Sequence, residues 1–287
     1  MKDGRTGMPS ELTKKVLITG ATGGIGQSLI PVFLENNYQI LAITRDVGKA
    51  QKMSFFNEVD FIELDIYREF QNLNIHSDIG VVHLAWQGLP NYKSEFHIGE
   101  NLPLNYTFIK YLVQNGIKNF LISGTCAEYG LQNGMLKSSA PTQPNTQYAF
   151  AKDALHKQLR FLQNDHEFNL KWARLFYIYG EGGERNNSIL KQLDKAIDDG
   201  DKTFNMSQGE QLRDYLAIEE VANQLFVLFE SQKNGAFNVC SGEPISIRSL
   251  VESHIEKRGS QIEINAGYYP YLDYEPMEFW GEKDISV

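Results

Sequence analysis

Short apolar runs alternate with longer amphipathic stretches along the first 175 residues of this 287-residue chain. A short, continuously apolar run is typical of a strand buried in a parallel sheet, and an amphipathic stretch is typical of a helix. The pattern predicts strands at 14–19, 38–44, 59–64, 79–85, 118–123 and 171–175, with helices near 100–115 and 148–164. This alternation predicts an α/β fold, a doubly wound parallel sheet over residues 14–175.

The rhythm changes after about Phe176, where loops rich in Gly, Asn and Asp separate the elements. The elements predicted there are helices near 188–199 and 218–230, a short strand at 237–239, a helix that begins near Ser246, and an irregular packed segment at 268–280. We expect the short strand to return to the main body, so that residues 176–287 form a substrate-capping region interleaved with the sheet domain. The polar residues 1–13 are predicted to be a flexible leader, because they lack the apolar core of a signal peptide.

The composition is ordinary for a soluble globular protein, with 42% hydrophobic and 22% charged residues. A formal net charge of -9 argues against nucleic acid or an anionic membrane as the main partner, since proteins that bind these carry a basic excess. Cys126 and Cys240 are too few for a disulfide framework, and no apolar run approaches the length of a membrane span. We therefore expect a cytoplasmic protein. The histidines and cysteines have no zinc-like spacing, so we expect no metal.

Three glycines follow the first predicted strand at the spacing G-x-x-G-x-x-G, namely Gly20, Gly23 and Gly26. Such glycines permit a tight turn, close approach of the backbone to a pyrophosphate, and close packing of helix on strand. The helix that they open, through about Asn36, would direct its N-terminus at the phosphates. This context predicts dinucleotide binding, and a turn with a purely structural role is the alternative.

Tyr148 and Lys152 lie four residues apart in a predicted helix, and therefore on one face of it. The ammonium group can then lie near the phenol and favour its ionised form. A phenol with the ordinary pKa of about 10 is a sluggish acid or base at neutral pH, so such help would matter for catalysis. Alone, a Tyr-x-x-x-Lys pattern is usually an ordinary helix face. The prediction therefore depends on the glycine motif.

Several further motifs, in order along nearly the whole chain, resemble those of the extended short-chain dehydrogenase/reductase family, also called the NAD-dependent epimerase/dehydratase family. They lie at residues 64–66, 83–85, 123–130, 174–180, 213–215 and 237–242. The resemblance implies a Rossmann-type domain with a small C-terminal region that binds a nucleoside-diphosphate sugar. It also allows a homodimer.

By the same resemblance, the catalytic residues are Thr125, Tyr148 and Lys152. Thr125 would hydrogen-bond the reacting sugar oxygen, and the alternative is a strand-end hydroxyl that satisfies local backbone. The positions implied to bind the cofactor are Gly20, Thr22, Gly23, Gly24, Ile25, Gly26, Thr44, Arg45, Asp65, Ile66, Leu84, Ala85, Trp86, Ser123, Tyr148, Lys152, Phe176 and Ile178. The positions implied to bind substrate are Thr125, Cys126, Tyr177 and Arg213.

Two of these positions have simpler alternatives. Asp65 would accept a hydrogen bond from the adenine amino group, although an Asp after a strand is more often a loop cap. Arg213 would bind the substrate diphosphate through charge-assisted hydrogen bonds, and a surface salt bridge to Asp214 or Glu210 is the alternative.

The choice of cofactor depends on the end of the second predicted strand. A carboxylate there would bind the ribose 2′-hydroxyl of NAD, whereas a 2′-phosphate needs donors and positive charge. Thr44 and Arg45 occupy that place, and Asp46 follows one residue later. Arg45 suits a 2′-phosphate and can stack on adenine, so we expect NADPH, with NADH as the alternative. A solvated surface arginine is the other interpretation.

The family contains dehydratases, epimerases and reductases, so the fold alone does not fix the reaction. Family dehydratases place an Asp-Glu pair directly after the catalytic Thr, whereas this chain has Cys126 and Ala127. Epimerases typically use NAD held by an acidic strand-end residue. We therefore expect NADPH-dependent reduction of a nucleoside-diphosphate 4-keto-6-deoxyhexose, in bacterial-type deoxysugar or surface polysaccharide biosynthesis. A 4-epimerase and a non-catalytic nucleotide sensor are the alternatives, and the base and the sugar configuration stay open.

Overall fold

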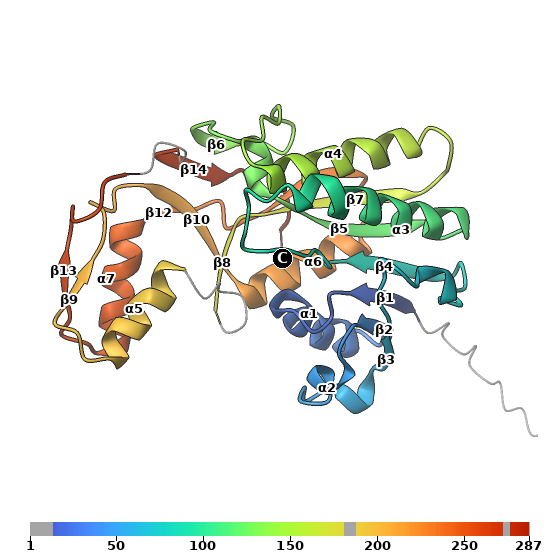
Figure 1. Cartoon of the computed structure of the whole chain (residues 1–287), viewed down its shortest axis with the longest axis horizontal. Helices are drawn as coiled ribbons and strands as arrows, with labels where there is room; N and C mark the ends of the chain where they lie inside the picture. Colours follow the sequence, from blue (N-terminus) through green and yellow to red (C-terminus); the bar gives the residue numbers. More distant parts are fainter. Residues whose placement is uncertain (1–13, 181–187, 272–275, 287) are drawn as a thin grey trace, which may run out of the picture.

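The computed structural model describes residues 14–180, 188–271 and 276–286, and its largest part is a seven-stranded parallel sheet (Figure 1). The strand order is β11-β7-β5-β4-β1-β2-β3. The bounds are β1 (Lys15–Thr19), β2 (Gln39–Thr44), β3 (Asp60–Glu63), β4 (Ile79–His83), β5 (Asn119–Thr125), β7 (Asn169–Leu175) and β11 (Gly235–Val239). The predicted α/β fold with a Rossmann-like parallel sheet is confirmed.

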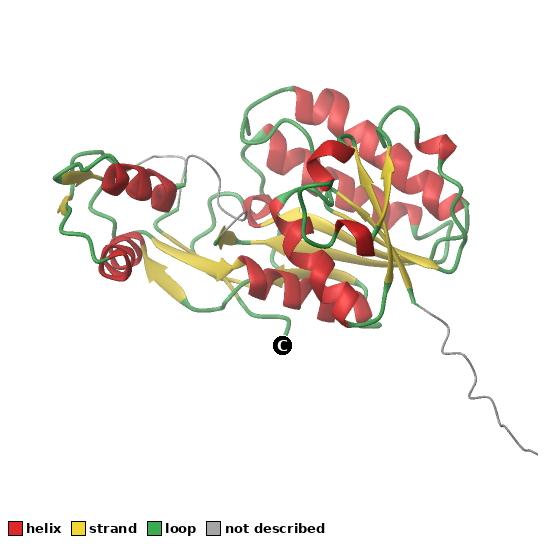
Figure 2. Cartoon of the chain, turned by 90° about the horizontal axis from the view of Figure 1, so that it is seen from below, coloured by secondary structure: helices red, strands yellow, loops and turns green. Residues whose placement is uncertain are grey.

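Helices cover both faces of this sheet, as Figure 2 shows. One face packs against α3 (Leu102–Gln114) and α4 (Gln147–Leu162), and the other against α1 (Gly24–Glu35) and α6 (Ile218–Glu230). Each strand therefore contributes alternate side chains to two cores. In β1, Leu17 belongs to the core under α3 and α4, while Val16 and Ile18 belong to the core under α1 and α6. Burial on both faces explains why these strands are continuously apolar.

The second region contains strands that the sequence did not predict. A mixed sheet consists of β12 (Pro244–Ser246), β10 (Leu212–Ala217), β14 (Glu278–Gly281) and β6 (Gly134–Leu136), with β8 (Tyr177–Tyr179) paired to β10. A further pair joins β9 (Thr203–Asn205) to β13 (Glu263–Asn265), beside α5 (Ile189–Asp198) and α7 (Ile247–Arg258). Figure 1 shows this last group at the far left of the view, away from the large sheet.

The prediction of an irregular segment at 268–280 is wrong at its end, because Glu278–Gly281 forms β14. This strand runs parallel to β6 and β10, which are distant in sequence, so no local pattern announces its partners. Residues 272–275 and the predicted leader 1–13 lie outside the described residues.

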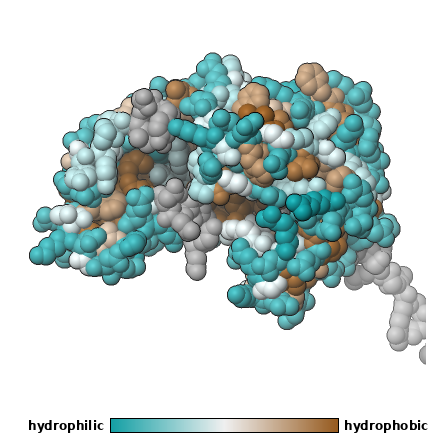
Figure 3. Space-filling model, in the orientation of Figure 1, coloured by the Kyte–Doolittle hydropathy of each residue, from teal (hydrophilic) through white to brown (hydrophobic). Residues whose placement is uncertain are grey.

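Two short elements complete the description. The helix α2 (Val47–Ala50) follows β2, and a π-helical turn at His97–Asn101 leads directly into α3. Within the described ranges, no helix is long and apolar enough to cross a membrane. In the space-filling view of Figure 3, hydrophobic residues form separate patches among mainly hydrophilic ones on the face shown.

The glycine turn after β1 depends on close backbone packing at two positions. Gly20 has a φ of +71°, in the left-handed region that favours glycine. A Cβ atom added at Gly26 would lie 2.5 Å from the Gly20 carbonyl oxygen and 2.7 Å from that of Ala21. Because both contacts are with backbone, a side chain at Gly26 would push α1 away from the end of β1.

We predict that Gly26→Ala lowers the free energy of unfolding by roughly 1–3 kcal/mol, the usual cost of overpacking a close contact. Thermal or urea unfolding would measure it. The matched control is Gly99→Ala, because a Cβ at Gly99 meets no atom within 4 Å. Equal stability of the two variants would contradict the role assigned to the Gly26 contact.

Candidate active site

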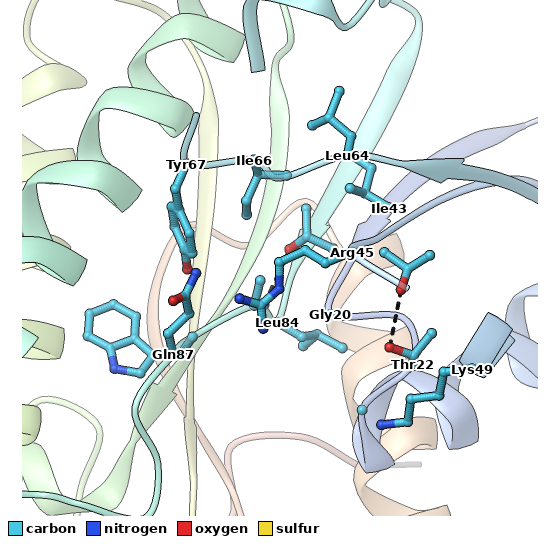
Figure 4. Close-up of a pocket in the computed structure, with 15 residues that line it drawn as sticks. Gly20, Thr22, Ile43, Arg45, Lys49, Leu64, Ile66, Tyr67, Leu84 and Gln87 are labelled. Carbon is cyan, nitrogen blue, oxygen red and sulfur yellow. Dashed lines mark hydrogen bonds between the residues drawn. The ribbon is translucent and has the colours of Figure 1, made fainter. Parts of the chain in front are cut away.

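A cavity of about 290 Å³ lies where the carboxyl ends of β1, β2, β3 and β4 meet (Figure 4). In an open α/β sheet, ligands bind in the crevice at this end of the strands. Of the residues predicted to bind the cofactor, the cavity lining includes Gly20, Thr22, Gly23, Thr44, Arg45, Ile66, Leu84, Ala85 and Trp86. It also includes residues that the sequence analysis missed, namely Thr19, Ile43, Lys49, Leu64, Tyr67 and Gln87.

The floor of the cavity is the glycine turn. Gly23 is the N-cap of α1 and has no side chain with which to cap the helix, so backbone groups form this end. The first turn of such a helix presents backbone N–H groups and the positive end of its dipole, which suits a pyrophosphate. Gly24, Ile25 and Gly26 form that turn. The residues present therefore fit a dinucleotide.

Basic side chains stand at the β2 end of the cavity. The Arg45 side chain reaches into the cavity, and Lys49 lies beside Thr22 (Figure 4). The Asp46 carboxylate accepts a hydrogen bond from the Lys49 backbone N–H at 2.9 Å, so it caps α2. In the loop after β3, the Asp65 carboxylate accepts a hydrogen bond from the backbone N–H of Tyr67 at 3.0 Å, as expected for a local loop cap. The only feature of the sequence that could have indicated Lys49 as a cavity residue is its position four residues after Arg45.

The predicted catalytic residues lie at the adjoining strand end. Thr125 is the last residue of β5, while Tyr148 and Lys152 lie in the first turns of α4, which the Thr146 side chain caps. All three are buried, and the Thr125 hydroxyl is close enough to the Tyr148 phenol to act on its pKa. Folding therefore brings together residues from two separate motifs.

The charge state of this group differs from the one that the sequence predicts. Burial raises the pKa of the Tyr148 phenol well above its ordinary value, and the nearby Thr125 hydroxyl only partly opposes this. The expectation that the phenol is shifted toward its ionised form is therefore wrong for the structure described. Burial also lowers the pKa of Lys152 to about 7, with the Glu128 carboxylate opposing the shift. The Lys152 ammonium donates to the Ser123 carbonyl oxygen at 2.6 Å.

Beneath Thr125 lies a buried ion pair between Glu128 and Arg174. The Arg174 Nε donates to Glu128 Oε2 at 2.7 Å, and both side chains are almost fully buried. Glu128 also accepts from the Thr125 backbone N–H at 2.9 Å and from the indole N–H of Trp172. Burial raises the pKa of Glu128, while Arg174 opposes that shift; Glu128 in turn raises the pKa of Arg174, although burial alone would lower it. Since every group that faces the carboxylate donates an N–H, we take it as ionised.

The residues predicted to bind substrate lie beside the mixed sheet. Arg213 is buried, its Nη1 donates to the Leu212 carbonyl oxygen at 2.9 Å, and its guanidinium lies 5.8 Å from the Tyr177 ring centroid. Arg213 is therefore not a solvated surface arginine. Cys126 is buried with Phe176 in a small apolar cluster, and Ile178 lies in β8. Asp214 accepts from the backbone N–H groups of Ser241, Gly242 and Gly281, so it ties the loop after β11 to β14.

A polar network behind the cavity was missed by the sequence analysis. His83 Nδ1 accepts from the Thr19 hydroxyl at 2.8 Å, and His83 Nε2 donates to the Asn105 side-chain oxygen at 2.7 Å. Burial lowers the pKa of His83 to about 4, so the ring is neutral at physiological pH. The motif at 83–85 marks His83, but nothing local indicates Asn105. Together these residues fix the β4 loop that lines the cavity.

The comparison with known sequences decides the family. The profile of the NAD dependent epimerase/dehydratase family matches residues 16–240. The chain belongs to this family. The resemblance based on the motifs is thereby confirmed at the level of the family. This is a family of enzymes that act on nucleotide sugars.

Two relatives and one solved structure illustrate the similarity. The chain is 31% identical to a dTDP-6-deoxy-L-talose 4-dehydrogenase (NAD(+)) of Aggregatibacter actinomycetemcomitans, over 93% of this chain and 99% of the relative. It is 25% identical to a dTDP-4-dehydro-6-deoxyglucose reductase of Escherichia coli, over 83% of this chain and 80% of the relative. The fold is similar to a UDP-N-acetylglucosamine 4-epimerase from Methanobrevibacter ruminantium, with a TM-score of 0.84, 22% identity, and coverage of 94% and 90%.

In the parts of the chain that the structure describes, no group of three or more His, Cys, Asp or Glu side chains could hold a metal ion.

We predict that Glu128→Gln lowers the free energy of unfolding by roughly 3–5 kcal/mol, because it leaves the Arg174 charge buried without its partner. Chemical unfolding of Glu128→Gln, Arg174→Met and the double variant would measure this. The double variant should lose less stability than the two single losses added together. Asp199→Asn, which removes a carboxylate from an exposed pair with Lys195, is the control and should leave the melting temperature unchanged. Strict additivity would show that the pair is not coupled.

Proposed function

We propose that the protein is an NADPH-dependent reductase of the 4-keto group of a nucleoside-diphosphate 4-keto-6-deoxyhexose. The observation that carries the proposal is the buried group of Thr125, Tyr148 and Lys152 at the strand end beside the dinucleotide cavity. Family membership supports a nicotinamide dinucleotide and a nucleotide sugar. The two relatives named above, a 4-dehydrogenase and a 4-dehydro-sugar reductase, support redox chemistry at C4 of a 6-deoxy sugar.

The proposed roles follow from what each group can donate. A dinucleotide would be held by the glycine turn, Arg45 and Lys152, and it supplies the hydride when bound. Tyr148 carries its proton at neutral pH and would donate it to the ketone oxygen, although its raised pKa makes it a weak acid that needs Lys152 to stabilise the phenolate. Thr125, beside the phenol, would align the sugar oxygen with it. Lys152, held by Ser123, would stabilise the phenolate that remains after proton donation.

In the proposed reductive direction the Tyr148 phenol must begin protonated, and its raised pKa ensures this at neutral pH. A protonated phenol is an acid, which reduction of a ketone requires, whereas oxidation of an alcohol requires a base. The dehydratase alternative lacks support, because Cys126 and Ala127 stand after Thr125 and burial raises the pKa of the Cys126 thiol to about 12. A thiol of that pKa is a poor acid-base at neutral pH.

The preference for NADPH is supported by Arg45 and Lys49, the two cations that line the cavity. Asp46 caps α2 through one carboxylate oxygen and does not belong to the cavity lining. The relative from Aggregatibacter carries NAD(+) in its name, and NADH is the competing cofactor. Direct comparison of the two therefore tests the assignment.

We predict that the protein binds NADPH more tightly than NADH, and that Arg45→Ala weakens NADPH binding roughly tenfold, the loss of one charge-assisted contact, and weakens NADH binding less. Fluorescence titration of both cofactors would give the dissociation constants. Lys52→Ala removes a positive charge from the same segment outside the cavity lining and is the control. Equal affinities of the parent protein for NADPH and NADH would contradict the proposal.

The reaction itself is tested by isotope transfer. NADPH deuterated at nicotinamide C4 is supplied with dTDP-, CDP-, GDP- and UDP-4-keto-6-deoxyhexoses, and the product is analysed by mass spectrometry and NMR. We expect one deuterium at sugar C4 for each NADPH oxidised. Tyr148→Phe should lower turnover by roughly 100-fold or more while leaving NADPH affinity near that of the parent, because only the proton donor is lost.

A 4-epimerase is the competing function, and it is the activity of the structurally similar Methanobrevibacter protein. An epimerase would invert a 4-hydroxy nucleotide sugar without added NADPH and with no net oxidation of cofactor. Inversion of that kind, or a product without deuterium, would replace the reductase assignment with the epimerase one. Absence of turnover with retained cofactor binding would favour a nucleotide sensor.

A further inference from the structure

The Trp86 side chain borders both the dinucleotide cavity and the buried end of Lys152. It lies in the loop after β4, and its ring centroid is 4.2 Å from the Lys152 Nζ. The same ring stands edge-on to the Tyr148 ring, with centroids 6.0 Å apart and an angle of 74° between planes. One indole therefore contacts both functional side chains of α4.

The indole is itself held by a fully buried histidine. The Trp86 Nε1 donates to His97 Nδ1 at 3.1 Å, with the two ring planes only 21° apart. His97 Nε2 lies 2.9 Å from the Asn91 carbonyl oxygen, which can only accept, so the histidine proton is on Nε2. Nδ1 is then the acceptor that the indole needs. His97 also begins the π-helical turn at His97–Asn101, a local distortion often found at functional sites.

The Lys152 ammonium lies between two kinds of electron-rich group. On one side it donates to the Ser123 carbonyl oxygen at 2.6 Å and approaches the Ser123 hydroxyl at 3.4 Å. On the other side is the Trp86 ring. The face of an indole carries partial negative charge, and its attraction for a cation is greatest where water is excluded. Lys152 is 2% exposed, so this condition is met.

We propose that Trp86 is a positioning residue that holds the charged Lys152 side chain against Ser123, and that His97 fixes the indole in the orientation this requires. The proposal rests on the proposed function, in which Lys152 helps to bind the dinucleotide. It adds two residues whose side chains act on Lys152.

The charged and titratable groups around Lys152 determine how the Trp86 ring should affect its protonation. Burial lowers the pKa of Lys152 to about 7, and Glu128 in the turn after β5 opposes this. The other titratable groups of this cluster are His83 on β4, whose pKa the Lys152 charge lowers, and Tyr148 and His97, whose rings lie against Trp86. A lysine loses its charge as the pH rises through its pKa. If the ring favours the charged form, its removal moves that loss to lower pH.

The test measures cofactor binding as a function of pH. NADPH and NADH are each titrated by fluorescence from about pH 5.5 to 9, and the midpoint is the pH at which half of the change in affinity has occurred. Because NADH has no 2′-phosphate, a midpoint that both cofactors share must come from the protein. We expect affinity to fall as pH rises in the parent protein, and the midpoint to move about one pH unit lower in Trp86→Leu, a tenfold change in proton affinity. Trp86→Phe keeps an aromatic face and should move it less.

The histidine is tested separately. His97→Gln retains an oxygen that can accept from the indole N–H, and it should keep a midpoint near that of the parent. His97→Leu has no acceptor and should move the midpoint in the same direction as Trp86→Leu. Phe161→Leu is the control, because Phe161 is an aromatic residue of the same helix that is 72% exposed, away from Lys152.

An unchanged midpoint in a folded Trp86→Leu protein would overturn the proposal. If that variant fails to fold, as judged by its melting curve, the histidine pair decides the question. Equal midpoints in His97→Leu and His97→Gln would then overturn it. A parent protein that binds neither dinucleotide would contradict the proposed function itself, and this proposal with it, whereas a protein that binds both but reduces no sugar would leave the role of Trp86 supported by its midpoint shift.

Discussion

The ion pair between Glu128 and Arg174 is the interaction on which the site depends. Glu128 accepts hydrogen bonds from β5 and β7. Arg174 also donates to the Tyr129 hydroxyl, which in turn donates to the Asn238 side chain in β11. Three neighbouring strands are thus joined beneath Thr125. Two charges taken out of water need several good hydrogen bonds, and the network supplies them. A rigid support of this kind fixes a hydroxyl in place where a surface loop would leave it mobile.

The sheet could be predicted from sequence because its strands are buried on both faces, as Val16, Leu17 and Ile18 illustrate. The strands of the mixed sheet could not. Those such as β6, β8, β12 and β14 are short, and they pair with segments far away in the chain, so neither length nor pattern distinguishes them from loops. The prediction of an irregular end at 268–280 failed for this reason.

The site shows the same division. The glycine turn and the Tyr148–Lys152 pair have fixed spacings and are visible in the sequence, since local geometry creates them. The direction of the phenol pKa was not predictable, because it is set mainly by burial, to which distant elements contribute. The partners of Lys152 were also hidden, since Ser123 and Trp86 come from two other strand ends.

The exchange of strands between the two regions has a consequence for how the protein is made. β11, which follows most of the mixed sheet in sequence, is an edge strand of the large sheet, while β6 leaves the first half of the chain to complete the mixed sheet. Neither sheet is finished by a continuous piece of chain. During synthesis the edge of β7 stays open until Val239 has left the ribosome, and Asn238 then closes both the sheet and the network beneath Thr125. One short segment, residues 235–239, therefore completes both the large sheet and the support of the site.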